Sequence, residues 1–261
     1  MLKCSGVHVA YGKREVLRGV SFELEGGAML AVIGPNGSGK TTLLRAVVGG
    51  VGVTSGEIAL NGAPVGSLSP RARARMSAYA AQRGGVAFAF TVREVVEMGG
   101  LSILALPGLV DEVLADLSLE EVASARISTL SIGQQQRVSL ARVLVQARAQ
   151  RASGGKSLIL VDEPTSAMDP FFAHRAMSVL QGEARAGSAV VVVLHDFGLA
   201  ERWCTHGLVL DESGVVRAFG PIAESVTPAM LEEVFKMRFA QIRVPHDGGE
   251  ARVTVPVRPT N

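Results

Sequence analysis

Three continuous apolar runs mark the chain and predict buried strands of a parallel sheet. They cover residues 28–33, 158–161 and 189–194, and polar residues or glycines follow each run directly. Uninterrupted apolar runs of this length are typical of strands covered on both faces. Residues 3–24 instead alternate between apolar and polar positions around a turn at 11–14, which predicts an antiparallel hairpin. The pattern therefore indicates an α/β fold whose mixed sheet has an antiparallel N-terminal part.

A glycine-rich stretch directly after the first apolar run predicts a phosphate-binding loop. It leads into an apolar segment that suits a helix, which is the strand-loop-helix context that such a loop needs. Glycines let backbone N–H groups converge on phosphate oxygens, and the helix N-terminus adds a favourable dipole. Lys40 supplies a charge for the outer phosphates, and the Thr41 hydroxyl is placed to bind Mg²⁺. The residues predicted to bind nucleotide here are Gly34, Asn36, Gly37, Ser38, Gly39, Lys40, Thr41 and Thr42.

Two other interpretations of this stretch are weaker. A plain glycine-rich turn would need neither Lys40 nor Thr41. A dinucleotide-binding fold has no use for these two residues and expects an acidic residue about twenty positions further on. The sequence therefore favours a nucleoside triphosphate site in a P-loop NTPase core.

Polar residues end several of the predicted strands. Asp162 and Glu163 end the second apolar run, and His195 follows the third. Gln82 ends a shorter strand that begins at residue 77. The C-terminal edge of a parallel sheet is the natural ligand site, where an Asp can hold Mg²⁺ and a Glu can orient or deprotonate a water molecule. A solvent-facing acidic strand end and a structural histidine are the alternative, but beside a phosphate loop we favour a catalytic constellation.

Helical periodicity between residues 91 and 128 predicts an inserted α-helical subdomain. Glycine and proline pairs interrupt this segment, and a long helix is expected from residue 138 to about residue 149. The last residues predict an edge hairpin with a loose end. We expect a single domain 1–261 with four parts: 1–82 for the N-terminal β part and phosphate-loop core, 83–150 for the helical subdomain, 151–225 for the rest of the catalytic core and 226–261 for a C-terminal extension.

Composition, charge and cysteine usage narrow the class of protein. The formal net charge of +2 is too small to argue for a nucleic-acid partner. No apolar segment reaches the length of a membrane span, and no apolar core follows Lys3 as it would in a secretion signal. Cys4 and Cys204 are expected to be reduced structural thiols. We therefore expect a cytoplasmic protein.

Taken in order, these motifs resemble those of the nucleotide-binding subunit of ABC transporters, and the resemblance covers nearly the whole chain. It implies an ATP hydrolase that uses ATP and Mg²⁺. Glu163 is then implied as the catalytic base, and His195 as the switch histidine that contacts the γ-phosphate. Gln82 matches the loop glutamine that reaches Mg²⁺ and the attacking water, and Asp162 and Thr41 match the other Mg²⁺ positions.

The segment 130–137 is similar to the signature motif of the same family. The resemblance implies that Ser131, Gly133 and Gln134 contact the γ-phosphate bound by a second copy, so that the unit of function is a head-to-tail dimer. Ile132 stands where the family has the first of two glycines. A β-branched residue dislikes positive φ, so we expect strain if this position needs such a backbone.

Two further roles rest on the resemblance. Judged by residue type alone, Tyr11 is an ordinary strand residue with its hydroxyl in water. The resemblance implies instead that Tyr11 stacks on adenine. It also places Asp169 in the loop through which the two copies communicate.

Several segments are most similar to the ATPases of haem importers, within the group that imports iron chelates and cobalamin. They are 88–99, 140–146, 193–196 and 231–235, with a strand around Pro245 and His246 after them. The region 101–108 is shorter and more apolar than in that group, so we expect a trimmed insert. The implied partners are a second copy, a separate membrane permease on whose inner face the chain would lie and, indirectly, a periplasmic or surface substrate-binding protein.

Three alternatives stay open at this point. The importer could serve a ferric siderophore or cobalamin instead of haem. A soluble ABC ATPase acting on ribosomes or DNA usually has two cassettes in one chain or a long coiled coil, and the sequence shows neither. A non-hydrolytic regulatory module would not need both Glu163 and His195.

Overall fold

The central sheet of the fold is built from the apolar runs. The computed structural model describes residues 1–82, 90–101, 107–246 and 249–257. The six strands follow the order β10-β9-β3-β8-β7-β6, and all neighbours are parallel except β10 and β9. Every residue of β3, β7 and β8 is buried, which explains their uninterrupted apolar composition. The bounds are β3 Met29–Ile33, β6 Ser77–Ala80, β7 Leu158–Asp162, β8 Ala189–Val193, β9 His206–Leu210 and β10 Val216–Pro221.

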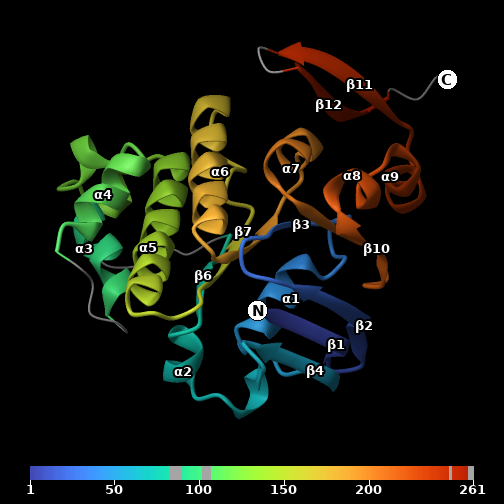
Figure 1. Ribbon diagram of the computed structural model, residues 1–261, viewed down its shortest axis with the longest axis horizontal. Coiled ribbons are helices and arrows are strands. Elements are labelled where there is room, and N and C mark those ends of the chain that lie inside the picture. The colour runs from blue at the N-terminus through green and yellow to red at the C-terminus, as the bar shows by residue number, and fades with distance from the viewer. Residues whose placement is uncertain (83–89, 102–106, 247–248, 258–261) are drawn as a thin grey trace.

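An antiparallel sheet and helix α1 (Lys40–Val47) cover one face of the central sheet (Figure 1). The strand order is β2-β1-β4-β5, and β1 and β2 form the predicted N-terminal hairpin. Side chains of β3 alternate between the two faces: Leu30 and Val32 enter this core, whereas Ala31 enters the opposite one. The strands of this sheet are β1 Leu2–Tyr11, β2 Arg14–Leu24, β4 Ser55–Leu60 and β5 Ala63–Pro64.

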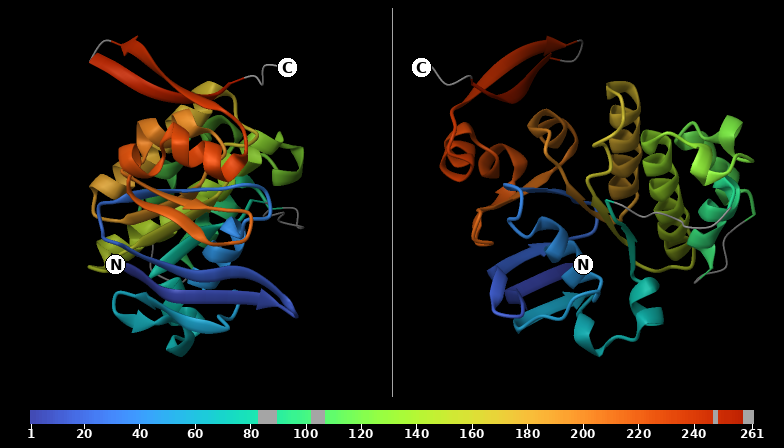
Figure 2. Two further views of the ribbon diagram at one scale, coloured as in Figure 1. Left: turned by 90° about the vertical axis from the view of Figure 1, so that its right-hand side faces the viewer. Right: turned by 180° about the vertical axis from the view of Figure 1, so that it is seen from behind.

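Helices cover the other face of the central sheet. Helices α3 and α4 lie beside α5, far from the antiparallel sheet (Figures 1 and 2). None of the helices in the described ranges is long and apolar enough to cross a membrane. Residues 83–89 and 102–106, which belong to the predicted insert, lie outside the described residues. The helices on this side are α3 Val92–Glu97, α4 Leu109–Asp116, α5 Ile132–Ala152, α6 Pro170–Arg185 and α7 Phe197–Trp203, and α2 Pro70–Ala74 precedes β6.

The long helix α5 begins at Ile132, not at residue 138 as predicted. Ser131 is its N-cap: the Ser131 Oγ accepts from the Gln134 backbone N–H at 3.2 Å, and Gln134 Oε1 accepts from the Ser131 N–H at 2.9 Å. This reciprocal pair is a capping box, which satisfies two amide groups at the helix start. Three glutamines near the start of α5 interrupt the helical spacing of apolar residues there. The Ser-x-x-Gln pattern, from Ser131 to Gln134, is the sequence signal that marks the start of this helix.

Arg148 of α5 joins the helical insert to the core. Its guanidinium pairs with Glu112 and Asp116 of α4 at 2.6 Å each and with Glu183 of α6 at 2.7 Å. The Glu183 side chain is only 4% exposed and Arg148 is 14% exposed, so removing either partner would leave a sheltered charge unpaired. The insert is therefore attached to α5 and α6 by charge as well as by apolar packing.

The C-terminal hairpin forms a sheet of its own and does not extend an edge of the central sheet, in contrast to the prediction. Strands β11 (Phe239–His246) and β12 (Gly249–Pro256) follow α8 (Ile222–Ser225) and α9 (Pro228–Phe235). The hairpin packs on α7, where Glu201 accepts from the backbone N–H and the hydroxyl of Thr254 at 2.7 and 2.5 Å. This long-range pair has no local sequence signal.

Candidate functional site

The loop between β3 and α1 has a backbone that only glycine permits at key positions. Gly39 has φ 96°, and a Cβ there would lie 2.6 Å from a methyl carbon of Leu17. At Gly34 a Cβ would lie 2.5 Å from the Leu210 carbonyl oxygen. No side chain caps the N-terminus of α1, so its first backbone N–H groups remain free for a ligand. The predicted phosphate loop therefore has the geometry of an anion cradle.

The Lys40 side chain bonds to the backbone of the loop that precedes it. Its Nζ donates to the carbonyl oxygens of Gly34 at 2.7 Å and Pro35 at 2.9 Å. Burial lowers the pKa of Lys40 below its usual range, and the carboxylates of Glu163 and Asp162 oppose that shift. The ammonium is thus held beside two acidic side chains at the mouth of the cradle.

Three buried oxygen atoms beside the loop lack a hydrogen-bond partner in the described part of the chain: Ser38 Oγ and both carboxylate oxygens of Asp162. Burial raises the pKa of Asp162, and the nearby Thr41 hydroxyl opposes that rise without reaching normal hydrogen-bond geometry. Buried polar groups are normally paired, so unpaired ones at a cleft indicate a place for a ligand. An orphaned carboxylate beside hydroxyl oxygens fits Mg²⁺, which prefers oxygen ligands.

The described residues contain no cluster of three or more His, Cys, Asp or Glu that could hold a metal unaided.

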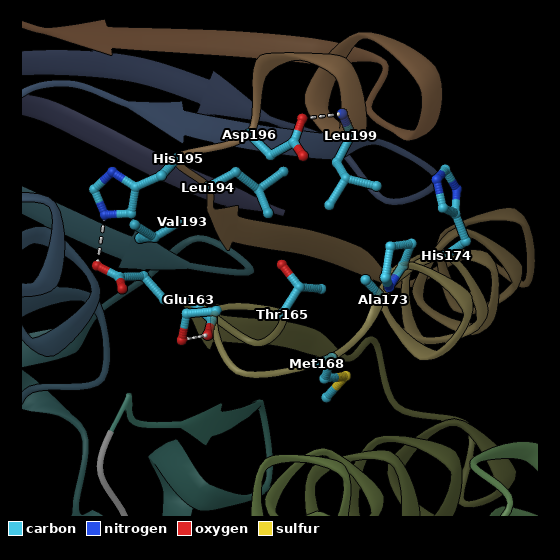
Figure 3. A pocket seen from close by; sticks show the side chains of 12 residues that line it. Glu163, Thr165, Met168, Ala173, His174, Val193, Leu194, His195, Asp196 and Leu199 are labelled. Carbon is cyan, nitrogen blue, oxygen red and sulfur yellow. Dashed lines mark hydrogen bonds and ion pairs between the residues drawn. The ribbon is translucent and has the colours of Figure 1, made fainter. Parts of the chain in front are cut away.

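Glu163 brings the three predicted catalytic residues together. Gln82 Nε2 donates to Glu163 Oε2 at 2.5 Å, and His195 Nε2 lies 2.8 Å from Glu163 Oε1. Figure 3 shows His195 reaching from the end of β8 toward this carboxylate. Glu163 also has a left-handed backbone, with φ 50°, which is strained for a residue with a long side chain. The structure thus holds Glu163 by both carboxylate oxygens directly after the buried Asp162.

A cavity of about 550 Å³ lies over the loop and includes all three of these side chains. Val16 of β2 also lines this cavity, and no sequence signal distinguishes it from other strand residues. Tyr11 does not line it and is 46% exposed at the end of β1, so its predicted stacking on adenine stays a prediction. The lining consists of Val16, Asn36, Gly37, Gly39, Lys40, Thr41, Thr42, Gln82, Glu163 and His195.

The signature residues lie at the N-terminal turn of α5 and do not line the phosphate-loop cavity. Ser131 and Gln134 satisfy each other in the capping box. A Cβ on Gly133 would lie 2.5 Å from the Ala167 carbonyl oxygen, so glycine is required there. Ile132 is the first helical residue, is 70% exposed and is absent from the positions with left-handed backbone. The strain considered for Ile132 is therefore absent.

Asp169 likewise serves as a helix cap. Its Oδ1 accepts from the Phe172 backbone N–H at 3.1 Å at the start of α6. The side chain is exposed, and it does not line the phosphate-loop cavity. Within one chain, the structure therefore joins Gln82, Glu163 and His195 to the phosphate loop and keeps Ser131, Gly133, Gln134 and Asp169 outside it.

The chain belongs to the ABC transporter family, whose pattern matches residues 17–166. It is 36% identical over 249 residues to the hemin import ATP-binding protein HmuV of Rhodopseudomonas palustris (strain BisA53), covering 95% of this chain and 92% of that protein. It is 38% identical over 239 residues to the protein of the same name from Pseudomonas entomophila (strain L48), covering 90% and 92%.

Solved structures agree with the family. A bacterial ABC transporter cassette solved as a dimer is 27% identical with a TM-score of 0.75, covering 85% of this chain and 99% of that one. A protein provisionally described as a metal-chelate type ABC transporter in an inward-facing conformation is 25% identical with a TM-score of 0.80, covering 98% and 97%. The fold is therefore shared with these two structures over 85% and 98% of the chain.

Proposed function

We propose that the chain is the ATP-binding and ATP-hydrolysing subunit that powers the import of haem through a separate membrane permease. The observation that carries the ATPase is the orphaned, buried Asp162 beside a loop lysine and a glutamate held by Gln82 and His195. Its curated relatives named as hemin import proteins support the cargo.

In this proposal the loop binds the phosphates of ATP through backbone N–H groups and Lys40. When phosphate enters, the Lys40 ammonium exchanges its bonds to the Gly34 and Pro35 carbonyls for phosphate oxygens. Thr41, Asp162 and Gln82 would hold Mg²⁺, which neutralises phosphate charge when bound. Ser38 and Asp162 then lose their unpaired state, which makes ligand binding favourable.

Glu163 accepts the proton of the attacking water in this account, and His195 contacts the γ-phosphate. Both oxygens of Glu163 are engaged in the structure, by Gln82 and by His195. A water could replace Gln82 at one of these oxygens, and the released Gln82 amide would then be available to help hold Mg²⁺. Glu163 is thus oriented before ATP binds. In this account the Gln82 bond to Glu163 breaks only when the site is occupied.

We further propose that two copies assemble head to tail, because the signature residues Ser131, Gly133 and Gln134 lie outside the cavity of their own chain. Each copy would complete the site of the other, with Asp169 in the loop between the two sites. A cavity of about 430 Å³ between Gln82 and α5 is the surface we assign to the permease. It is lined by the end of β6, by α5 and by residues of the segment 161–167, which includes Asp162 and Glu163.

A wider metal-chelate cargo is the second candidate, because of the likeness to the metal-chelate type transporter. A ferric siderophore or cobalamin would then replace haem. An ATPase subunit does not bind the transported molecule, so the site itself favours none of the three cargoes.

Reconstitution tests both parts. The chain is combined with its permease and binding protein in proteoliposomes, and ATP turnover is measured with haem, a ferric siderophore or cobalamin added outside. We expect stimulation and uptake with haem alone, and neither when Glu163→Gln replaces the native chain. Stimulation by another cargo would reject haem, and absence of ATP turnover in every arm would reject the ATPase.

A further inference from the structure

Glu163 is held by its backbone as well as by its carboxylate. Its carbonyl oxygen accepts from the Ser166 N–H at 3.4 Å and from the Ser166 hydroxyl at 3.2 Å. These bonds close a tight turn after β7, and the left-handed φ of 50° at Glu163 belongs to that turn. The direction of the Glu163 side chain therefore depends on how firmly this turn is fixed.

Gln136 of α5 holds the same turn from the other side. Its Nε2 donates to Ser166 Oγ at 2.8 Å and lies 3.5 Å from the Glu163 carbonyl oxygen. Its Oε1 accepts from the Ala167 backbone N–H at 3.1 Å. Because a backbone N–H can only donate, the Ala167 contact determines which end of the amide faces it, and Nε2 must face Ser166. One side chain thus joins three residues of the turn.

The first turns of α5 are packed tightly against this segment. Gly133 lies so close that a Cβ would meet the Ala167 carbonyl oxygen at 2.5 Å. Arg137 stacks over the Phe172 ring at 3.8 Å and donates to the carbonyls of Leu117 and Ser118 at 2.8 Å. The helix backbone that carries Gln136 is therefore held by contacts on both sides of it in sequence, at Gly133 and at Arg137.

We propose that Gln136 is a positioning residue for ATP hydrolysis: it locks the strained turn of Glu163 against the first turns of α5 and so aims the Glu163 carboxylate. Gln136 touches neither the phosphate loop nor the cavity above it. The inference rests on the proposed ATPase and adds a residue to which the signature resemblance assigns no role. Gln136 lines the neighbouring cavity of about 430 Å³ together with Glu163 and Ser166.

The test replaces Gln136 by Met in the full-length chain, which keeps the length of the side chain and removes its amide. We expect kcat to fall about 10- to 100-fold, because a small misplacement of a catalytic group has an effect of that size. KM for ATP should stay within about 2-fold, since the phosphate contacts are unchanged. The matched control is Gln146→Met, which removes an amide from the same helix that donates only to the Ala74 and Ser77 carbonyls; its kcat should stay near that of the native chain.

Ser166→Ala supplies a second, independent variant. It removes the hydroxyl between Gln136 and Glu163, and we expect a smaller loss in kcat with unchanged KM. If the two residues act through one turn, the double variant should be little slower than Gln136→Met alone.

The outcomes separate this inference from the proposed function. A native chain without ATP turnover would reject the proposed function. A native chain with turnover, together with a Gln136→Met variant of equal kcat or with a loss confined to KM, would overturn the positioning role. Additive losses in the double variant would overturn it as well.

Discussion

The phosphate loop and the signature turn both begin a helix, but they meet the helix start in opposite ways. At α1 no side chain caps the helix, and Ser38 and Asp162 are buried without partners in the described structure. At α5 the capping box satisfies the helix start before any ligand arrives. A ligand that pairs the unpaired groups at α1 would remove the free-energy cost of leaving them buried without partners. At α5 the capping box already pairs the polar groups of Ser131 and Gln134. The contrast supports the proposed arrangement, in which nucleotide binds to the loop of one copy and the signature turn of a second copy approaches it afterwards.

Of the changes considered, Glu163→Gln should have the largest effect on ATP hydrolysis. It removes the proposed base beside the phosphate loop and leaves both helix starts folded. We expect kcat to fall about 10²- to 10⁴-fold with ATP binding retained, the range for loss of a general base. Light scattering with ATP should then show a dimer that persists. Glu57→Gln, an exposed change on β4, is the control. Undiminished hydrolysis would exclude Glu163 as the base.

Lys40→Ala should weaken ATP binding to the phosphate loop and leave the signature turn unchanged. Loss of a charge-assisted bond is worth about 1.5–3 kcal/mol, so the Kd for ATP should rise about 10- to 150-fold in calorimetry. Lys156→Ala removes an exposed lysine and should leave Kd unchanged. Equal affinity in Lys40→Ala would show that its ammonium stays on the Gly34 and Pro35 carbonyls when ATP binds.

The signature turn can be tested with a pair of neighbouring changes. Gly133→Ala places a Cβ against the Ala167 carbonyl, and we expect a loss of about 1–3 kcal/mol in the free energy of unfolding. Ile132→Ala, at an exposed helical position, should change it by less than about 0.5 kcal/mol. Urea unfolding measures both. A larger loss for Ile132→Ala than for Gly133→Ala would contradict the close approach of Gly133 to the Ala167 carbonyl.

The smallest effect concerns the turn between β9 and β10, where Asp211 accepts hydrogen bonds from Ser213 and Val215. Burial alone would raise the pKa of Asp211, but hydrogen bonds from Ser213 and Val215 lower it. A carboxylate with a lowered pKa stabilises the fold above its unfolded pKa of about 3.9 and loses this as pH falls through its folded pKa. Asp211→Asn should therefore cost about 1 kcal/mol at pH 7 and progressively less below about pH 4. If Asp211→Asn lowers the free energy of unfolding equally at all pH values, the lowered pKa of Asp211 is not the cause of the loss.

Local patterns predicted most of the elements, because strand burial and the loop before α1 are written in adjacent residues. The approach of Gln82 and His195 to Glu163 was expected from the shared sheet edge. Contacts between distant segments were not predictable: Thr254 binds Glu201, Gln136 binds Ala167, and Val16 enters the cavity without any local signal. The condition for strain at Ile132 is not met, because position 132 has a helical backbone, and a family pattern alone does not show which of two adjacent positions needs glycine.

The central claim is that the two regions form one site only across two copies, and cysteine cross-linking tests it most directly. Burial raises the pKa of both native thiols, Cys4 and Cys204, to about 12, so they should stay unreactive. Asn36→Cys and Ser131→Cys are placed on separate chains that carry Glu163→Gln, mixed, and treated with a short cross-linker. We predict a covalent dimer that forms with ATP and not without it. A cross-link that ignores ATP, or none between these two positions, would contradict the account.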